Sequence, residues 1–208
     1  MAKFRNAGQT CVCANTFFVH ESIVEVFTAK LAAKVAALVV GDGLTPGVTT
    51  GPVISARAVE GAAAFVADAV ARGARIVMGG SRPTNVGAKG HFFAPTVLVN
   101  VSRDSACVTS EIFGPIAPVV TFRDEQDAVA LANASSAGLA AYFYTRDAGR
   151  AVRVADALRV GMVGVNAGSV SAASAPFGGV KDSGFGREGA REGLLEYTET
   201  KLIMQGGF

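Results

Sequence analysis

Short apolar runs alternate with amphipathic stretches through the second half of the sequence, and this alternation constrains the fold more than any other feature. Apolar runs at 116–122, 139–145 and 162–165 predict strands. The stretches between them, 125–135 and 147–159, have the apolar spacing of helices. A strand–helix–strand order favours right-handed crossovers between parallel strands. The chain is therefore expected to fold as an α/β domain with a largely parallel sheet.

The first half of the sequence adds two helices and further strands. Helical spacing predicts a helix over 22–40, with a capping box of Ser22 and Glu25 at its start and Gly41 at its end. A second helix is expected over 55–72. Short strands are expected at 17–19, 75–78 and 96–99.

Composition narrows the class of protein further. The 208 residues are 50% hydrophobic, which is enough to form a core without disulfides and excludes an intrinsically disordered chain. A formal net charge of +2 is not the basic footprint of a nucleic-acid binder. No apolar run approaches the roughly 20 residues that a membrane-spanning helix requires. Three cysteines cannot form a complete disulfide framework, so we expect a cytoplasmic protein with reduced thiols.

Two of the cysteines, Cys11 and Cys13, follow a short segment that contains Asn6, Gly8 and Gln9. These neighbours suit an exposed turn, and a cysteine at the start of a helix would gain thiolate character from the helix dipole. The alternative role for such a cysteine is that of a small buried hydrophobic residue. The local sequence leaves both roles open.

The remaining polar motifs match none of the common catalytic, metal-binding or nucleotide-binding patterns. His20 and His91 lie in other segments, so no Ser-His-Asp or Cys-His arrangement is indicated. The cysteine spacing matches no common metal site, and no metal is expected. The glycine-rich segment 176–188 lacks both the P-loop and the dinucleotide-binding fingerprint. Glu111 and Phe113 precede a predicted strand, where a cofactor-binding role and a plain structural role fit equally well.

Several segments resemble, in order and spacing, the C-terminal half of the aldehyde dehydrogenase superfamily. The matching segments are Asn6–Cys11, Glu111–Pro115, Gly138–Ala141, Asn166 and Pro176–Gly179. Within the superfamily, Lys3–Asn15 and Gly184–Gly189 are most similar to the succinate-semialdehyde dehydrogenase group. The resemblance implies a three-layer αβα catalytic domain with a largely parallel sheet, without the family's nucleotide-binding domain.

The resemblance also implies a chemistry. Cys11 would attack the aldehyde carbon as a thiolate, its backbone N–H would help to hold the oxyanion, and water would hydrolyse the resulting thioester. Glu111 would hold the nicotinamide ribose and Phe113 would border the ring, with NAD or NADP as the cofactor. Cys13 is a redox candidate, because it could form a strained disulfide with Cys11.

The substrate implied by the resemblance is a small aldehyde with a distal carboxylate, such as succinic semialdehyde, which is oxidised to succinate. Arg5 matches a carboxylate-binding position of the succinate-semialdehyde group, and a guanidinium suits bidentate recognition of a carboxylate. Ser171 matches the hydroxyl partner at the same carboxylate. Phe177 is expected to shape the aldehyde tunnel.

Two domain-level expectations follow. Residues 1–190 are expected to form the catalytic domain, and 191–208 a strand-like tail, centred on 194–204, through which a homo-oligomer assembles. The resemblance places the nucleotide-binding domain, the second oxyanion-hole residue and the general base in an N-terminal half outside this sequence. We therefore expect little turnover from the isolated chain. The alternative is a catalytically inactive fragment that acts only as an α/β association module.

Overall fold

The computed structural model describes residues 2–87 and 89–207. The chain divides into two compact units, Met1–Ser135 and Ser136–Phe208, which we call the N-terminal unit and the C-terminal unit and describe separately. Among the described residues, no helix combines the length and apolarity needed to cross a membrane.

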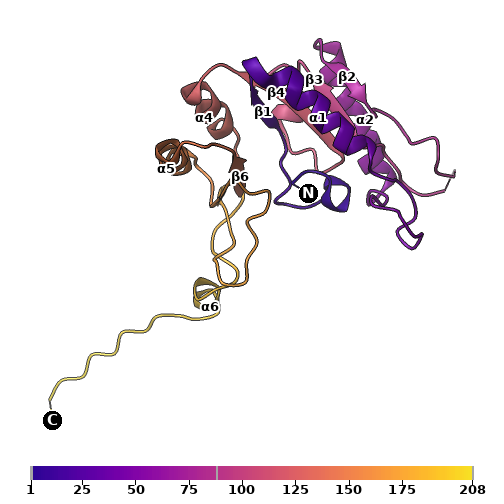
Figure 1. The fold of residues 1–208 in the computed structure, drawn as a ribbon. Helices are drawn as coiled ribbons and strands as arrows, with labels where there is room; N and C mark the ends of the chain where they lie inside the picture. Colours follow the sequence, from indigo (N-terminus) through magenta and orange to yellow (C-terminus); the bar gives the residue numbers. More distant parts are fainter. Residues whose placement is uncertain (1, 88, 208) are drawn as a thin grey trace. The chain divides into compact units, whose positions relative to one another are not determined.

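The N-terminal unit is built on a four-stranded sheet with the strand order β1-β4-β3-β2 (Figure 1). Strand β4 pairs in parallel with β1 on one side and with β3 on the other, whereas β2 joins β3 in the antiparallel direction. The expectation of a largely parallel sheet is therefore confirmed. The strands are β1 (Phe17–His20), β2 (Arg75–Met78), β3 (Thr96–Val99) and β4 (Ile116–Phe122).

Helices cover both faces of this sheet. Successive strand residues point to opposite faces, so each strand contributes to two apolar layers. Helix α1 (Val24–Ala36) packs through Val24, Phe27 and Leu31 on one layer. Helix α2 (Ala56–Ala71) packs on the other layer. The strand residues beneath α1 are Val19, Val99 and Val119, and those in the α2 cluster are Leu98, Ile116 and Val120. These layers form the expected αβα arrangement.

The predicted boundaries hold for α2 but not for α1. Ser55 caps α2 by accepting a hydrogen bond from the backbone N–H of Ala58 at 3.2 Å. Helix α1, by contrast, is shorter than the predicted 22–40 at both ends and has no Ser22–Glu25 capping box. At its C-terminal end, Val39 leaves the helical spacing because its carbonyl accepts bonds from the N–H groups of residues 49 and 50.

Three further short elements follow β1 and β3 or end the N-terminal unit. A 3₁₀ turn, η2, precedes α1, and the one-turn helix α3 lies between β3 and β4. Helix α4 begins after Asp124, whose side chain accepts a bond from the Asp127 N–H at 2.9 Å. The bounds of these elements are η2 (Glu21–Ile23), α3 (Ala106–Thr109) and α4 (Glu125–Asn133).

The C-terminal unit contains two strand pairs. Strands β6 and β7 are parallel and are joined by helix α5, as the alternation in the sequence predicts. Asp147 caps α5 by accepting the Arg150 N–H at 3.0 Å. Strands β5 and β8 form a short antiparallel pair. The elements are β5 (Ala137–Gly138), β6 (Ala140–Phe143), α5 (Ala148–Ala157), β7 (Met162–Val165) and β8 (Val180–Lys181).

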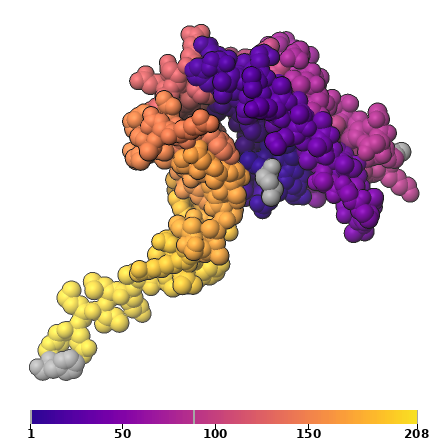
Figure 2. All heavy atoms as spheres, viewed as in Figure 1, coloured from indigo at the N-terminus to yellow at the C-terminus, as the bar shows by residue number. Residues whose placement is uncertain are grey.

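The expected strand at 194–204 is absent from the described chain. Helix α6 (Glu192–Leu195) occupies its beginning, and the following residues extend without regular structure (Figures 1 and 2). A strand needs a neighbour for its N–H and carbonyl groups, and residues 2–87 and 89–207 provide none for this segment. Its apolar side chains, Leu202, Ile203 and Met204, are more than three-quarters exposed.

Candidate active site

The segment around Cys11 folds as a closed loop at the start of the N-terminal unit. The Ala14 N–H donates to the Ala2 carbonyl at 2.8 Å, and the Cys13 N–H donates to the Thr10 carbonyl at the same distance. Cys11 therefore lies at the corner of a tight turn, where its side chain is exposed. Of the two roles left open by the sequence, the exposed turn is the one found, and because Cys11 does not begin a helix, no helix dipole acts on its thiol.

The residues before this turn have an unusual backbone. A short 3₁₀ element, η1 (Arg5–Gly8), contains Asn6 and Ala7 with φ angles of 51° and 55°, and Gly8 follows with a φ of 78°. Left-handed conformations cost energy for residues with a side chain, and they concentrate at functional sites. The strained backbone of η1 therefore marks the Cys11 loop as a candidate functional site.

Position 8 requires glycine, because the backbone there lies close to the backbone of Gly114. A Cβ atom at this position would lie 2.1 Å from the carbonyl oxygen of Gly114, a distance that real Cβ atoms do not reach. The contact brings the Cys11 loop against the segment that carries Glu111 and Phe113. Two of the motifs that the sequence separates by about a hundred residues therefore meet in one place.

The side chain of Asn15 fastens the same two segments together. Its amide nitrogen donates to the carbonyls of Cys107 and Ser110 at 3.1 and 3.0 Å, and its oxygen accepts the Ile112 N–H at 2.8 Å. Sequence reasoning assigned Asn15 no role. The available signal was a carboxamide two residues before the start of β1.

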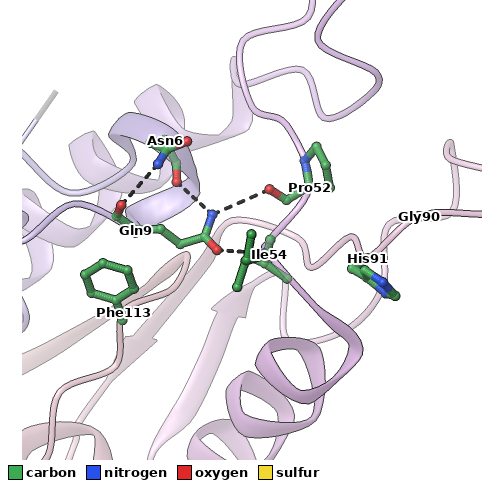
Figure 3. Close-up of a pocket in the computed structure, with 8 residues that line it drawn as sticks. Asn6, Gln9, Pro52, Ile54, Gly90, His91 and Phe113 are labelled. Carbon is green, nitrogen blue, oxygen red and sulfur yellow. Dashed lines mark hydrogen bonds between the residues drawn. The ribbon is translucent and has the colours of Figure 1, made fainter.

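Gln9 joins the Cys11 loop to a third segment. Its side-chain oxygen accepts the Ile54 N–H at 2.8 Å, and its nitrogen donates to the carbonyls of Asn6 and Pro52 at 3.1 and 3.5 Å (Figure 3). The role of Gln9 was not expected either, because the approach to residue 55 is glycine- and proline-rich and reads as a plain loop.

A surface depression of about 540 Å³ lies beside Gln9 (Figure 3). Phe113 contributes to its wall with a ring that is 46% exposed and a φ of 43°. Cys11, Arg5 and Glu111 are not among its lining residues. The lining consists of Asn6, Gln9, Pro52, Val53, Ile54, Gly90, His91 and Phe113.

The remaining predicted residues of the N-terminal unit lie around the loop. The side chains of Arg5 and Glu111 are exposed. The Arg5 carbonyl accepts from the Thr10 hydroxyl at 3.5 Å and from the Cys13 thiol at 3.7 Å, so both side chains hold the backbone of Arg5 in place. Cys13 is partly exposed.

Ser171 and Phe177 belong to the C-terminal unit. Ser171 is exposed in an irregular segment after β7. Phe177 is partly exposed and exchanges two backbone hydrogen bonds with Glu188, at 2.8 and 2.7 Å. Asn166 joins Thr145 through its side chain, accepting the Thr145 N–H at 2.8 Å and donating to its carbonyl at 2.9 Å. Substrate binding by Ser171 and Phe177 remains a prediction.

The described residues contain no group of three or more His, Cys, Asp and Glu side chains that could hold a metal ion. The Cys11 loop and the segment packed against it present four chemical groups. They are an exposed thiol, an exposed guanidinium, an exposed carboxylate and a half-exposed aromatic ring, from Cys11, Arg5, Glu111 and Phe113. Such a set suits nucleophilic attack on a small polar substrate.

Comparison with curated proteins gives close relatives over almost the whole chain. Mitochondrial succinate-semialdehyde dehydrogenase of Rattus norvegicus is 52% identical over 207 residues, which are 99% of this chain and 39% of the rat protein. Glutarate-semialdehyde dehydrogenase of Pseudomonas aeruginosa is 49% identical over 100% of this chain and 42% of its own length. The chain thus spans about two-fifths of the length of these relatives.

The fold of this chain is also found in solved structures. A crystal structure of an NADP-dependent enzyme from E. coli superposes with a TM-score of 0.92 and 48% identity, over 95% of this chain and 40% of that one. At the level of the family, residues 1–203 of this chain match the aldehyde dehydrogenase family. The loop around Cys11 and the segment packed against it are therefore parts of a known fold, and the chain belongs to the aldehyde dehydrogenase family.

Proposed function

We propose that this chain carries the catalytic cysteine of an NAD(P)-dependent aldehyde dehydrogenase that oxidises an aldehyde with a distal carboxylate. Succinic semialdehyde is the proposed substrate, and succinate the product. The observation that carries the proposal is the contact of Gly8 with Gly114, because it holds the Cys11 loop against Glu111 and Phe113. The names of the rat and Pseudomonas relatives, both semialdehyde dehydrogenases, support the same class of substrate.

Cys11 is the proposed nucleophile. Its thiolate attacks the aldehyde carbon, a C–S bond forms, and the carbonyl oxygen becomes the oxyanion of a thiohemiacetal. Within the described part of the chain, the backbone N–H of Cys11 donates to no protein acceptor. This free donor, on the residue that attacks, is suited to bind the developing oxyanion. Water finally hydrolyses the thioester and frees the thiol.

Glu111 and Phe113 are the proposed contacts to the cofactor. The exposed Glu111 carboxylate can accept hydrogen bonds from ribose hydroxyls, and the exposed face of Phe113 can border a nicotinamide ring. The depression beside Phe113 leaves room for a flat group. The chemistry that NAD or NADP supplies when bound is hydride acceptance, which converts the Cys11 thiohemiacetal into a thioester.

Arg5 is the proposed partner of the distal carboxylate. It begins η1, six residues before the nucleophile, and its guanidinium is exposed and able to make a bidentate pair. Because Thr10 and Cys13 both donate to its carbonyl, the Arg5 backbone is tied to the turn that carries Cys11. Ser171 is proposed as the hydroxyl partner, and Phe177 as a wall of the aldehyde tunnel.

The test is NAD(P)H formation from succinic semialdehyde, followed by absorbance. Because the chain spans two-fifths of its relatives, it is assayed alone and with the N-terminal part of a family member supplied. We expect turnover only in the second case, no turnover in Cys11→Ser, and retained turnover in the matched control Cys13→Ser. An absorbance that rises in neither case overturns the proposal.

A second candidate function is association between copies of the chain through the tail. The observation that favours it is the exposure of Leu202, Ile203 and Met204, at 82, 78 and 87%. Three consecutive exposed apolar side chains are a liability unless something covers them. On this reading a homo-oligomer forms whether or not the chain is catalytically active, and light scattering that shows a clean monomer contradicts it.

A further inference from the structure

Gln9 lies two residues before Cys11, and its side chain extends from the loop toward the segment that precedes α2 (Figure 3). Both polar atoms of its carboxamide are used. The oxygen accepts the Ile54 N–H at 2.8 Å, and the nitrogen donates to the carbonyls of Asn6 and Pro52 at 3.1 and 3.5 Å. Because this side chain both donates and accepts, a carboxylate or an apolar group of similar size can form only part of the set, or none of it.

The segment that receives these bonds is itself fixed in the N-terminal unit. Val53 is only 3% exposed, and its N–H donates to the His91 carbonyl at 2.7 Å. Ser55 follows directly and caps α2. The bonds from Gln9 therefore tie its loop to a buried backbone segment and to the start of a helix.

A second carboxamide holds the other side of the turn. Asn15, four residues after Cys11, makes three hydrogen bonds to backbone groups of the segment 107–112. Cys11 thus lies between two side chains that reach two different parts of the N-terminal unit. Of these two, Gln9 is the one that also lines the depression of about 540 Å³, so it anchors the turn on the side where a ligand can enter.

The anchors determine how one peptide group is oriented. The Thr10 carbonyl accepts the Cys13 N–H at 2.8 Å. Because a peptide group is planar, this bond also sets the direction of the Cys11 N–H, which belongs to the same group and is the proposed oxyanion donor. The local bond thus orients the peptide within the turn, and the bonds of Gln9 orient the turn within the unit.

We propose that Gln9 is a positioning residue for the attack by Cys11, because its carboxamide aligns the thiol and the oxyanion-binding N–H with the carbonyl group of a substrate. The inference rests on Cys11 being the nucleophile of the proposed function. Gln9 itself touches no reacting atom. Since the N–H acts only when an oxyanion forms, reactions of the thiol that form none should be independent of Gln9.

The test compares two reactions of the same thiol in the full chain. With p-nitrophenyl acetate, the Cys11 thiolate adds to the carbonyl carbon, and the oxyanion then collapses to a thioester as p-nitrophenolate leaves. With iodoacetamide, the thiolate displaces iodide and no oxyanion forms. Absorbance follows the first reaction, and mass spectrometry follows the second. Both are measured in a Cys13→Ser background, where Cys11 is the exposed thiol.

We expect Gln9→Leu to slow the release of p-nitrophenolate by about tenfold or more, because a small displacement of a nucleophile costs a large factor in rate. The rate of alkylation by iodoacetamide should stay the same. The matched control Gln126→Leu removes an exposed carboxamide from α4 and should change neither rate. If Gln9→Leu slows both reactions equally, or slows neither, the inference is overturned.

Gln9→Glu replaces Gln9→Leu if the latter does not fold, as judged by thermal unfolding. It keeps the acceptor for the Ile54 N–H but loses the donor, so the same selective loss is expected.

Cys11→Ser separates this inference from the proposed function. If the release of p-nitrophenolate is absent, or is unchanged by Cys11→Ser, the proposed nucleophile fails and the role of Gln9 fails with it. If the release depends on Cys11 but is the same in Gln9→Leu, only the positioning role is overturned. A release that depends on both residues, with alkylation unchanged, supports the inference.

Discussion

At the scale of single residues, the site depends on the absence of a side chain at position 8. Gly8 has no Cβ, and only for that reason can the Cys11 loop reach the carbonyl of Gly114. Its φ of 78° adds a second requirement, because residues with side chains avoid this region. One position thus controls both the path of the loop and its distance from Glu111.

Replacing Gly8 by Ala is therefore expected to destabilise the chain by about 2 kcal/mol or more, since both a clash and an unfavourable backbone angle are introduced. Urea denaturation measures the change in the free energy of unfolding. The matched control is Gly43→Ala, where a Cβ meets nothing within 4 Å and φ is not positive. A Gly8→Ala chain as stable as the Gly43→Ala chain would show that the contact is not maintained in solution.

The spacing of Cys11 and Cys13 carries a separate prediction at this scale. Mild peroxide should lower the free-thiol count from three to one, because an exposed and a partly exposed thiol lie two residues apart whereas Cys107 is buried. Titration with a chromogenic disulfide measures the count, and a reductant should restore it. In Cys13→Ser no such reversible loss of two thiols is expected, and an unchanged count in the native chain contradicts the disulfide.

At the scale of elements, charged side chains at helix ends link neighbouring segments. Arg103, which follows β3, makes two hydrogen bonds to Asp127 in α4, at 2.9 and 2.7 Å. This guanidinium holds the pKa of the Asp127 carboxyl below its usual value. The pKa of Asp68 in α2 is lowered in the same way by Arg72 and by the backbone N–H of Ala106.

These shifts give the pH dependence of stability a definite sign. A carboxylate whose pKa is depressed on folding stabilises the native state above its unfolded pKa, near 3.8, and this contribution is lost as the pH falls through the folded value. The thermal midpoint is therefore expected to drop as the pH is lowered below about 4. Asp127→Asn should flatten that drop, whereas Asp182→Asn, at a carboxyl that pairs with no guanidinium among the described residues, should not.

Local sequence signals predicted most helices and strands, but they did not predict the contacts between distant segments. Ser55 correctly marked the start of α2, because an N-cap acts through residues close in sequence. The end of α1 was missed, because the apolar spacing continues through Val39 although its backbone bonds to residues 49 and 50. The contacts of Gly8 and Asn15 could not be predicted, since they join residues about a hundred positions apart in the sequence and leave no periodic pattern.

At the scale of the whole molecule, the tail after α6 presents a run of exposed apolar side chains. From the end of α6 to residue 207 the chain forms no helix or strand, and the side chains of Leu202, Ile203 and Met204 are exposed. A segment of this kind becomes a strand when a sheet edge accepts its hydrogen bonds. The strand that the sequence predicted at 194–204 is not formed, and the described residues provide no neighbouring edge for it.

Removal of residues 200–208 should therefore abolish association and leave the unfolding transition nearly unchanged, because none of residues 200–207 belongs to either apolar cluster. Light scattering measures the mass, and circular dichroism measures the thermal midpoint. A milder control replaces Ile203 by Lys in the full chain, which should weaken association without shortening it. Unaltered mass in the truncated chain would exclude the tail as the association surface.

The contact between Gly8 and Gly114 also has a consequence for the order of synthesis. A ribosome adds about 5–20 residues each second, so residue 114 emerges several seconds or more after residue 8. During that interval the loop has no surface to close against, and its two thiols are held only by local turns. The nascent chain thus passes through a period in which the path of the Cys11 loop is not yet fixed by Gly114.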